Sequence, residues 1–203
     1  MPQLRSRSLT LGVGMSKHTS WVRVGTVTAS QGIYSKISLA GALVTPLLTF
    51  APFVLVRFEL IGGEGRDLFV VLLPGLLLLI PLHEGIHWLT ARLSGAPGDK
   101  CGFGFARGFP YFRAHIPLPI RRYRAVLLAP GAALTLVTTL LAIVQDNFAW
   151  AVLAGLSLAS GIGDYYWFWR LRDVAAEHWV LDPPGLVGVE LLTPAITADP
   201  SEE

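Results

Sequence analysis

Four long apolar segments, separated by polar connections, dominate the chain: residues 38–56, 68–92, 125–144 and 148–169. A helix needs about 20 mostly apolar residues to cross the ~30 Å hydrocarbon core of a bilayer. Each segment is close to this length, and the second carries polar residues only near its far end. The pattern therefore predicts four transmembrane helices.

The connections between these segments indicate how the helices follow one another. Residues 145–147 form a short polar link, which is typical of two antiparallel helices. Residues 100–117 alternate aromatic and small side chains around Arg107 and Gly108, a pattern that favours a β-hairpin. We therefore expect an all-α integral membrane protein, a four-transmembrane-helix bundle with a short β-hairpin inserted between the second and third helices.

Polar flanks surround the apolar part of the chain. Residues 1–35 are basic, rich in Ser, Thr and Gly, and without a periodic apolar face, so we expect a flexible cytosolic arm. Residues 36–172 hold the four predicted spans and form a membrane domain. Residues 173–203 are expected to be a cytosolic tail that begins with a short helix and continues as an extension containing Pro and Gly.

Lysine and arginine residues are unevenly distributed around the four spans. Cytosolic loops of membrane proteins carry an excess of these residues. They gather before the first span, between the second and third, and after the fourth: Arg5, Arg7, Lys17, Arg23, Arg92, Lys100, Arg107, Arg113, Arg121, Arg122, Arg124, Arg170 and Arg172. We therefore expect a multi-pass protein of the cell membrane with both termini in the cytosol.

The composition supports a lipid bilayer as a partner. The 203 residues are 52% hydrophobic and 15% charged, with a formal net charge of +2. Such a chain is too apolar for a disordered protein, and its basic residues are too scattered for nucleic-acid binding. Cys101 is the single cysteine, so a bound metal would need histidine and carboxylate ligands. The sequence does not indicate an oligomeric state.

One short motif carries metal chemistry. His83-Glu84-Gly85-Ile86-His87 matches H-E-x-x-H, in which two histidines four residues apart lie on one helix face and can bind one Zn²⁺. Glu84 would lie beside the metal and accept a proton from an attacking water. The motif predicts a zinc metalloprotease. The alternative is a pair of interfacial histidines and a glutamate that reaches the headgroups.

A third zinc ligand is expected, because a hydrolytic zinc usually takes three protein ligands. Asp164 is the only acidic residue within the body of the fourth span, and an intramembrane carboxylate is a candidate functional group. His83 and Asp164 lie at matching depths, about 22 to 24 Å from the outer ends of their spans at ~1.5 Å per residue. The three side chains can therefore meet near the cytosolic end. Alternatively, Asp164 caps its helix or lies beside Arg170.

Other candidates carry less specific signals. His115 in the hairpin and His178 in the tail are alternative third ligands, although isolated histidines are more often surface or core residues. The sequence Gly102-Phe103-Gly104-Phe105 lacks the helix and acidic residue of a dinucleotide site. Proteases commonly bind substrate as an added β-strand, so these four residues are candidates for substrate binding.

HEGIH at the end of a span, SGIGDYYW in the last span and the GFGF hairpin between them resemble a family of prokaryotic multi-pass membrane proteins known as putative zincin peptidases. The resemblance covers roughly residues 68–190. It implies zinc binding by His83, His87 and Asp164 and acid–base catalysis by Glu84.

The chain is also distantly similar to the site-two proteases, intramembrane metalloproteases in which an Asp from a later transmembrane helix completes H-E-x-x-H. Where their pattern has Leu-Asp-Gly, this chain has Gly163-Asp164-Tyr165.

The leading hypothesis is a membrane-embedded zinc-dependent endopeptidase that cleaves membrane-anchored or membrane-proximal polypeptides near the cytosolic face. One alternative is a non-catalytic metal-binding scaffold or sensor, for which a closed site with four protein ligands is typical. Another is an ion- or proton-coupled transporter, for which an inverted repeat would be expected.

Overall fold

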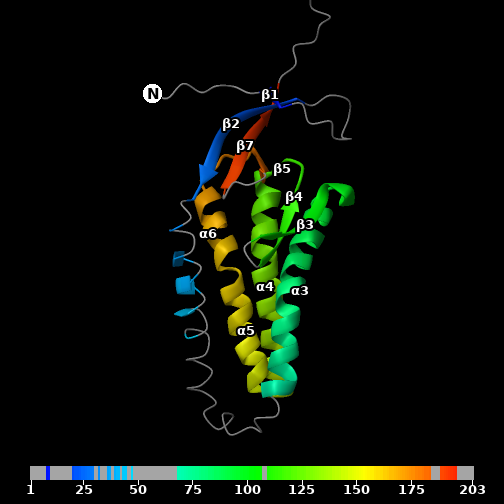
Figure 1. Ribbon diagram of the computed structural model, residues 1–203, viewed down its shortest axis with the longest axis vertical. Helices are drawn as coiled ribbons and strands as arrows, with labels where there is room; N and C mark the ends of the chain where they lie inside the picture. The colour runs from blue at the N-terminus through cyan, green and yellow to red at the C-terminus, as the bar shows by residue number, and fades with distance from the viewer. Residues whose placement is uncertain are drawn as a thin grey trace, which may run out of the picture.

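The computed structural model describes residues 8–9, 20–29, 68–106, 109–183 and 188–195, and isolated positions between 32 and 47. Its long axis is built from the π-helical turn η2 (Leu68–Leu72) and the helices α3 (Leu73–Leu93), α4 (Ile120–Gln145), α5 (Phe148–Ser160) and α6 (Ile162–Leu171), as Figure 1 shows. A short 3₁₀ helix, η3 (Gly98–Lys100), follows α3.

Three helices in the described part of the chain are long and apolar enough to cross a membrane: Val70–Leu93, Ile120–Gln145 and Phe148–Leu171, the last of which joins α5 and α6. They correspond to the second, third and fourth predicted spans. Large apolar side chains on them remain exposed, among them Leu77, Leu136 and Val144, as expected for helices that face lipid. The first predicted span, 38–56, lies outside the described residues apart from a few isolated helical positions.

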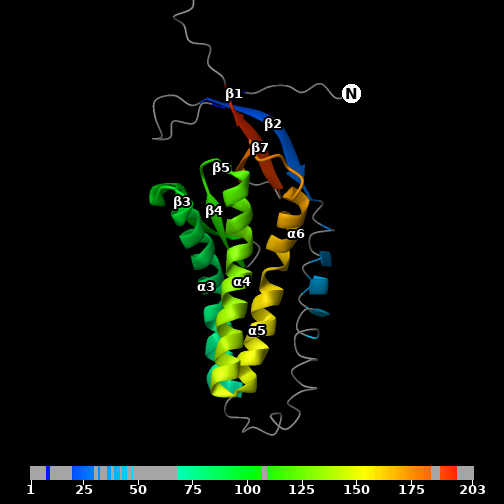
Figure 2. The ribbon, with the colours of Figure 1, turned by 180° about the vertical axis from the view of Figure 1, so that it is seen from behind.

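Helix α4 is the central element of the bundle. It packs against α3 on one side and against α5 and α6 on the other, and the two opposite views in Figures 1 and 2 both place it between them. The turn into α5 is tight: Asp146 adopts a left-handed conformation with φ of 47°, and the Asn147 side chain accepts a hydrogen bond from the Ala149 amide at 2.9 Å. The short polar link thus makes α4 and α5 antiparallel neighbours.

The hairpin between α3 and α4 is present as expected. Strands β3 (Cys101–Ala106) and β4 (Phe109–Ala114) pair antiparallel, with Phe103 opposite Phe112. Both strands contact α3. The hairpin therefore lies along the helix that carries the H-E-x-x-H motif.

The prediction of an all-α protein is wrong, because a five-stranded antiparallel sheet covers one end of the helices (Figure 1). Its order is β1-β2-β7-β6-β5. The strands are β1 (Ser8–Leu9), β2 (Trp21–Thr28), β5 (Leu118–Pro119), β6 (Trp179–Leu181) and β7 (Gly188–Pro194). Strands therefore occupy part of the predicted arm and part of the predicted tail, while the division into domains stays a prediction.

The physical reason for this difference lies in β2. The strand is rich in Trp, Val and Thr, which favour β structure, but a register shift between Arg23 and Gly25 interrupts the period of two that reveals a strand. Its partner β7 lies near the other end of the chain. The Arg23 guanidinium donates to Glu190 across this pair at 2.9 Å, and the Trp21 and Trp179 rings lie 4.9 Å apart.

Arg124 connects the sheet end of α4 to the end of α6. Its guanidinium donates to the carbonyls of Leu171, Arg172 and Val174 at 2.6, 2.9 and 2.7 Å. Leu171 is the last residue of α6 and the other two follow it, in the region where carbonyls lack an amide four residues later in the helix. The contact fixes the end of the helix that carries Asp164.

Glycine at 131 is required by the close approach of α4 to α6. A Cβ there would overlap the hydroxyl and the ring of Tyr165. We expect Gly131→Ala to lower the free energy of unfolding by about 1 to 3 kcal/mol, despite the better helix propensity of Ala. Gly85→Ala is the matched control, because nothing lies within 4 Å of a Cβ at that helical position; it should raise stability by up to about 1 kcal/mol. Thermal unfolding in one detergent measures both, and equal effects would contradict this account of the packing.

Candidate metal centre

Helix α3 places the two motif histidines on the same buried face. His83 and His87 are 7% and 6% exposed, and their ring centroids lie 4.9 Å apart. One helical turn separates them, because four residues cover slightly more than a turn of 3.6 residues. Burial of two imidazoles requires partners for their nitrogen atoms.

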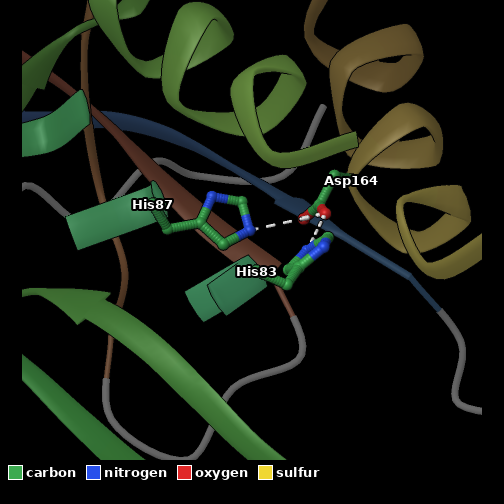
Figure 3. Close-up of side chains that lie close together, drawn as sticks. All are labelled: His83, His87 and Asp164. Atoms are coloured by element: carbon green, nitrogen blue, oxygen red, sulfur yellow. Dashed lines mark hydrogen bonds and ion pairs between the residues drawn. The ribbon is translucent and has the colours of Figure 1, made fainter. Parts of the chain in front are cut away.

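Asp164 reaches the same point from α6. Its Oδ2 atom lies 3.0 Å from His83 Nε2 and 3.4 Å from His87 Nε2, and Figure 3 shows the carboxylate pointing between the two rings. One ligand atom from each of the three side chains falls within 4.8 Å of the others. This is the one group of three or more His, Cys, Asp or Glu residues with metal-binding geometry in the described part of the chain. The matching depths of His83 and Asp164 along their spans predicted that these side chains lie close together.

The protonation of His87 follows from its partner. Its Nδ1 lies 2.8 Å from the backbone carbonyl of Val126 on α4. A carbonyl oxygen only accepts, so the proton of a neutral His87 ring resides on Nδ1. The Nε2 lone pair then faces the Asp164 carboxylate with no proton from His87 between them, an arrangement that a cation stabilises.

The ligand set fits zinc. Two imidazole nitrogens and one carboxylate oxygen are donors that Zn²⁺ accepts, and three protein ligands are typical of catalytic rather than structural sites. Among the described residues, no fourth protein ligand joins His83, His87 and Asp164.

Glu84 lies beside this group and is held by the hairpin. Its carboxylate accepts a hydrogen bond from the Phe112 amide of β4 at 2.6 Å. The Phe112 ring also stacks on His87, with centroids 6.1 Å apart and planes 18° from parallel. Because amides alternate between the two edges of a strand, the edge of β4 opposite β3 faces Glu84.

A second carboxylate occupies the same edge of β4. Asp182, which follows β6, accepts hydrogen bonds from the Ala114 amide and from the Tyr123 hydroxyl, the latter at 2.7 Å. Arg113 donates to the Pro183 carbonyl at 2.5 Å. Burial raises the pKa of the Asp182 carboxyl above its ordinary value, although these hydrogen bonds and the nearby Arg113 act in the opposite direction. The segment after β6 thus anchors β4.

The remaining predicted residues lie outside the group of three candidate ligands. Gly102, Phe103, Gly104 and Phe105 belong to β3, the strand on the far side of β4. His115 is exposed, and its ring lies next to Gly102. His178 is half-buried between α6 and β6 and lies outside the metal-binding group. Neither histidine joins the site as an alternative third ligand.

Three contacts of the site escaped sequence reasoning: the Val126 carbonyl, the Phe112 amide, and the Ser160 hydroxyl, whose Oγ lies 3.2 Å from His83 Nδ1. Two of these are backbone groups, which every residue has, so the sequence carries no direct signal for them. Ser160 could have been noticed, because it lies four residues before Asp164, a spacing that puts two residues on one face of a continuous helix.

Comparison with known proteins agrees with this geometry. A family model described as "Putative zincin peptidase" matches residues 76–179, which include the motif, the hairpin and Asp164. An "Uncharacterized 24.7 kDa protein in gap 5'region" of Pyrococcus woesei is 31% identical over 144 residues, which cover 70% of this chain and 64% of that protein. The alignment therefore spans less than two thirds of the relative's length. No solved structure matches the chain.

The family match covers more than half of the chain and confirms the resemblance to zincin peptidases, while the similarity to site-two proteases stays a prediction. The description of this family is consistent with a site that brings together His83, His87 and Asp164. The chain belongs to the family described as "Putative zincin peptidase".

Proposed function

We propose that this protein is a membrane-embedded, zinc-dependent endopeptidase. The observation that carries the proposal is the convergence of His83, His87 and Asp164 from two helices, with the Glu84 carboxylate next to them. Membership of the family supports the class of reaction. The substrates we propose are membrane-anchored or membrane-proximal polypeptides.

Each residue has a role in this proposal. His83 Nε2, His87 Nε2 and Asp164 Oδ2 would hold the zinc ion. When bound, zinc supplies Lewis acidity that makes an attacking water more acidic and polarises the scissile carbonyl. Glu84 accepts the proton of that water and passes it to the leaving amine. Without substrate, one of its two oxygens accepts a hydrogen bond from the Phe112 amide.

The hairpin offers a place for an extended substrate. A peptide paired with the outer edge of β4 would lie beside Glu84. A peptide paired with the outer edge of β3 would be separated from Glu84 by both strands of the hairpin, and each strand adds a spacing of ~4.8 Å. We therefore place the scissile segment along β4. Gly102, Phe103, Gly104 and Phe105 in β3 then support that strand from behind.

The position of the two terminal segments supports the proposed topology. Strand β2 precedes the helices and β7 follows them, yet the two strands pair over most of their length. Both segments must therefore lie at the same end of the bundle, the end rich in Arg. By the preference of Lys and Arg for the cytosolic side, we place this end, and both termini, in the cytosol of a cell-membrane protein.

The metal assignment is tested by zinc content. Detergent-purified wild type, dialysed after zinc loading, should retain about one zinc per chain, whereas His83→Ala and Asp164→Ala should lose it because each removes a ligand. His115→Ala is the matched control, since this histidine lies outside the group, and it should retain zinc. Elemental analysis measures all four proteins, and metal-free wild type would contradict the assignment.

The role of Glu84 is tested by Glu84→Gln. The amide still accepts the Phe112 hydrogen bond but cannot take a proton, so zinc content should be unchanged while turnover falls on the order of 10²- to 10⁴-fold. Turnover is measured on a membrane-anchored polypeptide that the wild type cleaves in detergent or vesicles. Full turnover by this zinc-loaded variant would show that Glu84 is not the base.

A further inference from the structure

The imidazole nitrogens that face away from Asp164 both have partners. A metal-binding histidine holds its orientation and tautomer by donating the other ring N–H to an acceptor, and loss of this acceptor typically weakens metal binding by about 10- to 100-fold. In this chain the acceptors come from two different helices: the Val126 carbonyl of α4 for His87, and the Ser160 hydroxyl at the end of α5 for His83.

The Val126 carbonyl has no amide partner four residues later in α4, because that residue is Pro130. In an α-helix the carbonyl of one residue accepts from the amide four residues later. The residue four positions after Val126 is Pro130, which lies inside α4 and has no amide hydrogen. Pro130 is also fully buried. The acceptor for His87 Nδ1 at 2.8 Å is thus a carbonyl that the helix itself does not use.

The Ser160 hydroxyl has one proton, which it donates in a hydrogen bond to a neighbouring carbonyl. Ser160 Oγ donates to the Ser157 carbonyl one turn earlier, at 2.7 Å. Its remaining lone pairs can only accept, and His83 Nδ1 lies 3.2 Å away. This hydrogen-bond chain places the proton of a neutral His83 on Nδ1 and leaves the Nε2 lone pair directed at Asp164 Oδ2, 3.0 Å away.

We infer that Ser160 and Pro130 are positioning residues for the metal centre, which fix His83 and His87 in the tautomer that presents Nε2 to the ion. The inference rests on the proposed zinc site and extends it to residues that do not touch the metal. Ser160 is the last residue of α5, and Gly161 alone separates it from α6, which carries Asp164. The same apolar span, Phe148–Leu171, therefore supplies one ligand and orients another.

The test is zinc affinity, measured by chelator competition with Zn²⁺ alone on the full chain in detergent. Ser160→Ala should bind zinc about 10- to 100-fold more weakly than wild type, and Ser160→Thr, which keeps the hydroxyl, should restore binding. Ser157→Ala is the matched control. Ser157 lies one turn away and is fully buried, its hydroxyl has no hydrogen-bond partner among the described residues, and its backbone carbonyl survives the substitution. It should bind zinc as the wild type does.

A second variant addresses α4. Pro130→Ala restores an amide that competes with His87 for the Val126 carbonyl, so zinc binding should weaken, and the loss should multiply with that of Ser160→Ala. The thermal midpoint of each metal-free variant shows whether the fold is retained. If Pro130→Ala does not fold, the three serine variants still decide the role of Ser160.

The inference would be overturned if Ser160→Ala bound zinc as tightly as wild type. It would also be overturned if Ser157→Ala or Ser160→Thr lost as much affinity as Ser160→Ala, which would indicate a packing role only. These results differ from a failure of the proposed function. Zinc binding that depends on Ser160, in a protein that cleaves no peptide, would support the inference and overturn the peptidase, whereas a wild type that binds no zinc would overturn both.

Discussion

The structure depends on how one carboxylate is compensated inside an apolar bundle. Asp164 lies in a helix that is apolar enough to cross a membrane, where an isolated charge is costly. Its oxygen is 3.0 and 3.4 Å from the Nε2 atoms of His83 and His87, whose lone pairs face it. The compensation that we propose is therefore a cation shared by the three side chains, which requires α6 to approach α3 at this depth. Helix α4, packed against both, makes this approach possible and supplies the carbonyl that holds His87.

Three polar side chains around this point have backbone partners, and His83 is held by the Ser160 hydroxyl. Glu84 accepts from the Phe112 amide, His87 donates to the Val126 carbonyl, and Ser160 donates to the Ser157 carbonyl. Backbone partners cannot change rotamer, and these three come from β4, α4 and α5. The side chains of the site are therefore oriented by rigid elements on three sides, which is the support that a preorganised centre requires.

The sequence predicted those features that depend on local pattern or on distance along a helix. Apolar length located three of the described helices, the i, i+4 spacing paired His83 with His87, and equal depth brought Asp164 to them. The sheet was missed because its central pairing is non-local: Arg23 meets Glu190 across 167 positions of sequence, and the bulge after Arg23 hides the period of β2. The backbone contacts of Phe112 and Val126 were equally out of reach, because they depend on how the hairpin and α4 pack rather than on residue type.

The position of β4 links substrate binding to catalysis in the proposed enzyme. The Phe112 amide holds Glu84, and it is also the amide that a peptide paired along this edge would use. One N–H donates fully to one acceptor, so a substrate carbonyl that takes it must release Glu84. The next outward amide, that of Ala114, is bound by Asp182, which belongs to the segment between β6 and β7 in the terminal sheet. The strand is therefore fixed at one end by the sheet and held at the other by the base, so a paired substrate would itself free the carboxylate that acts on it.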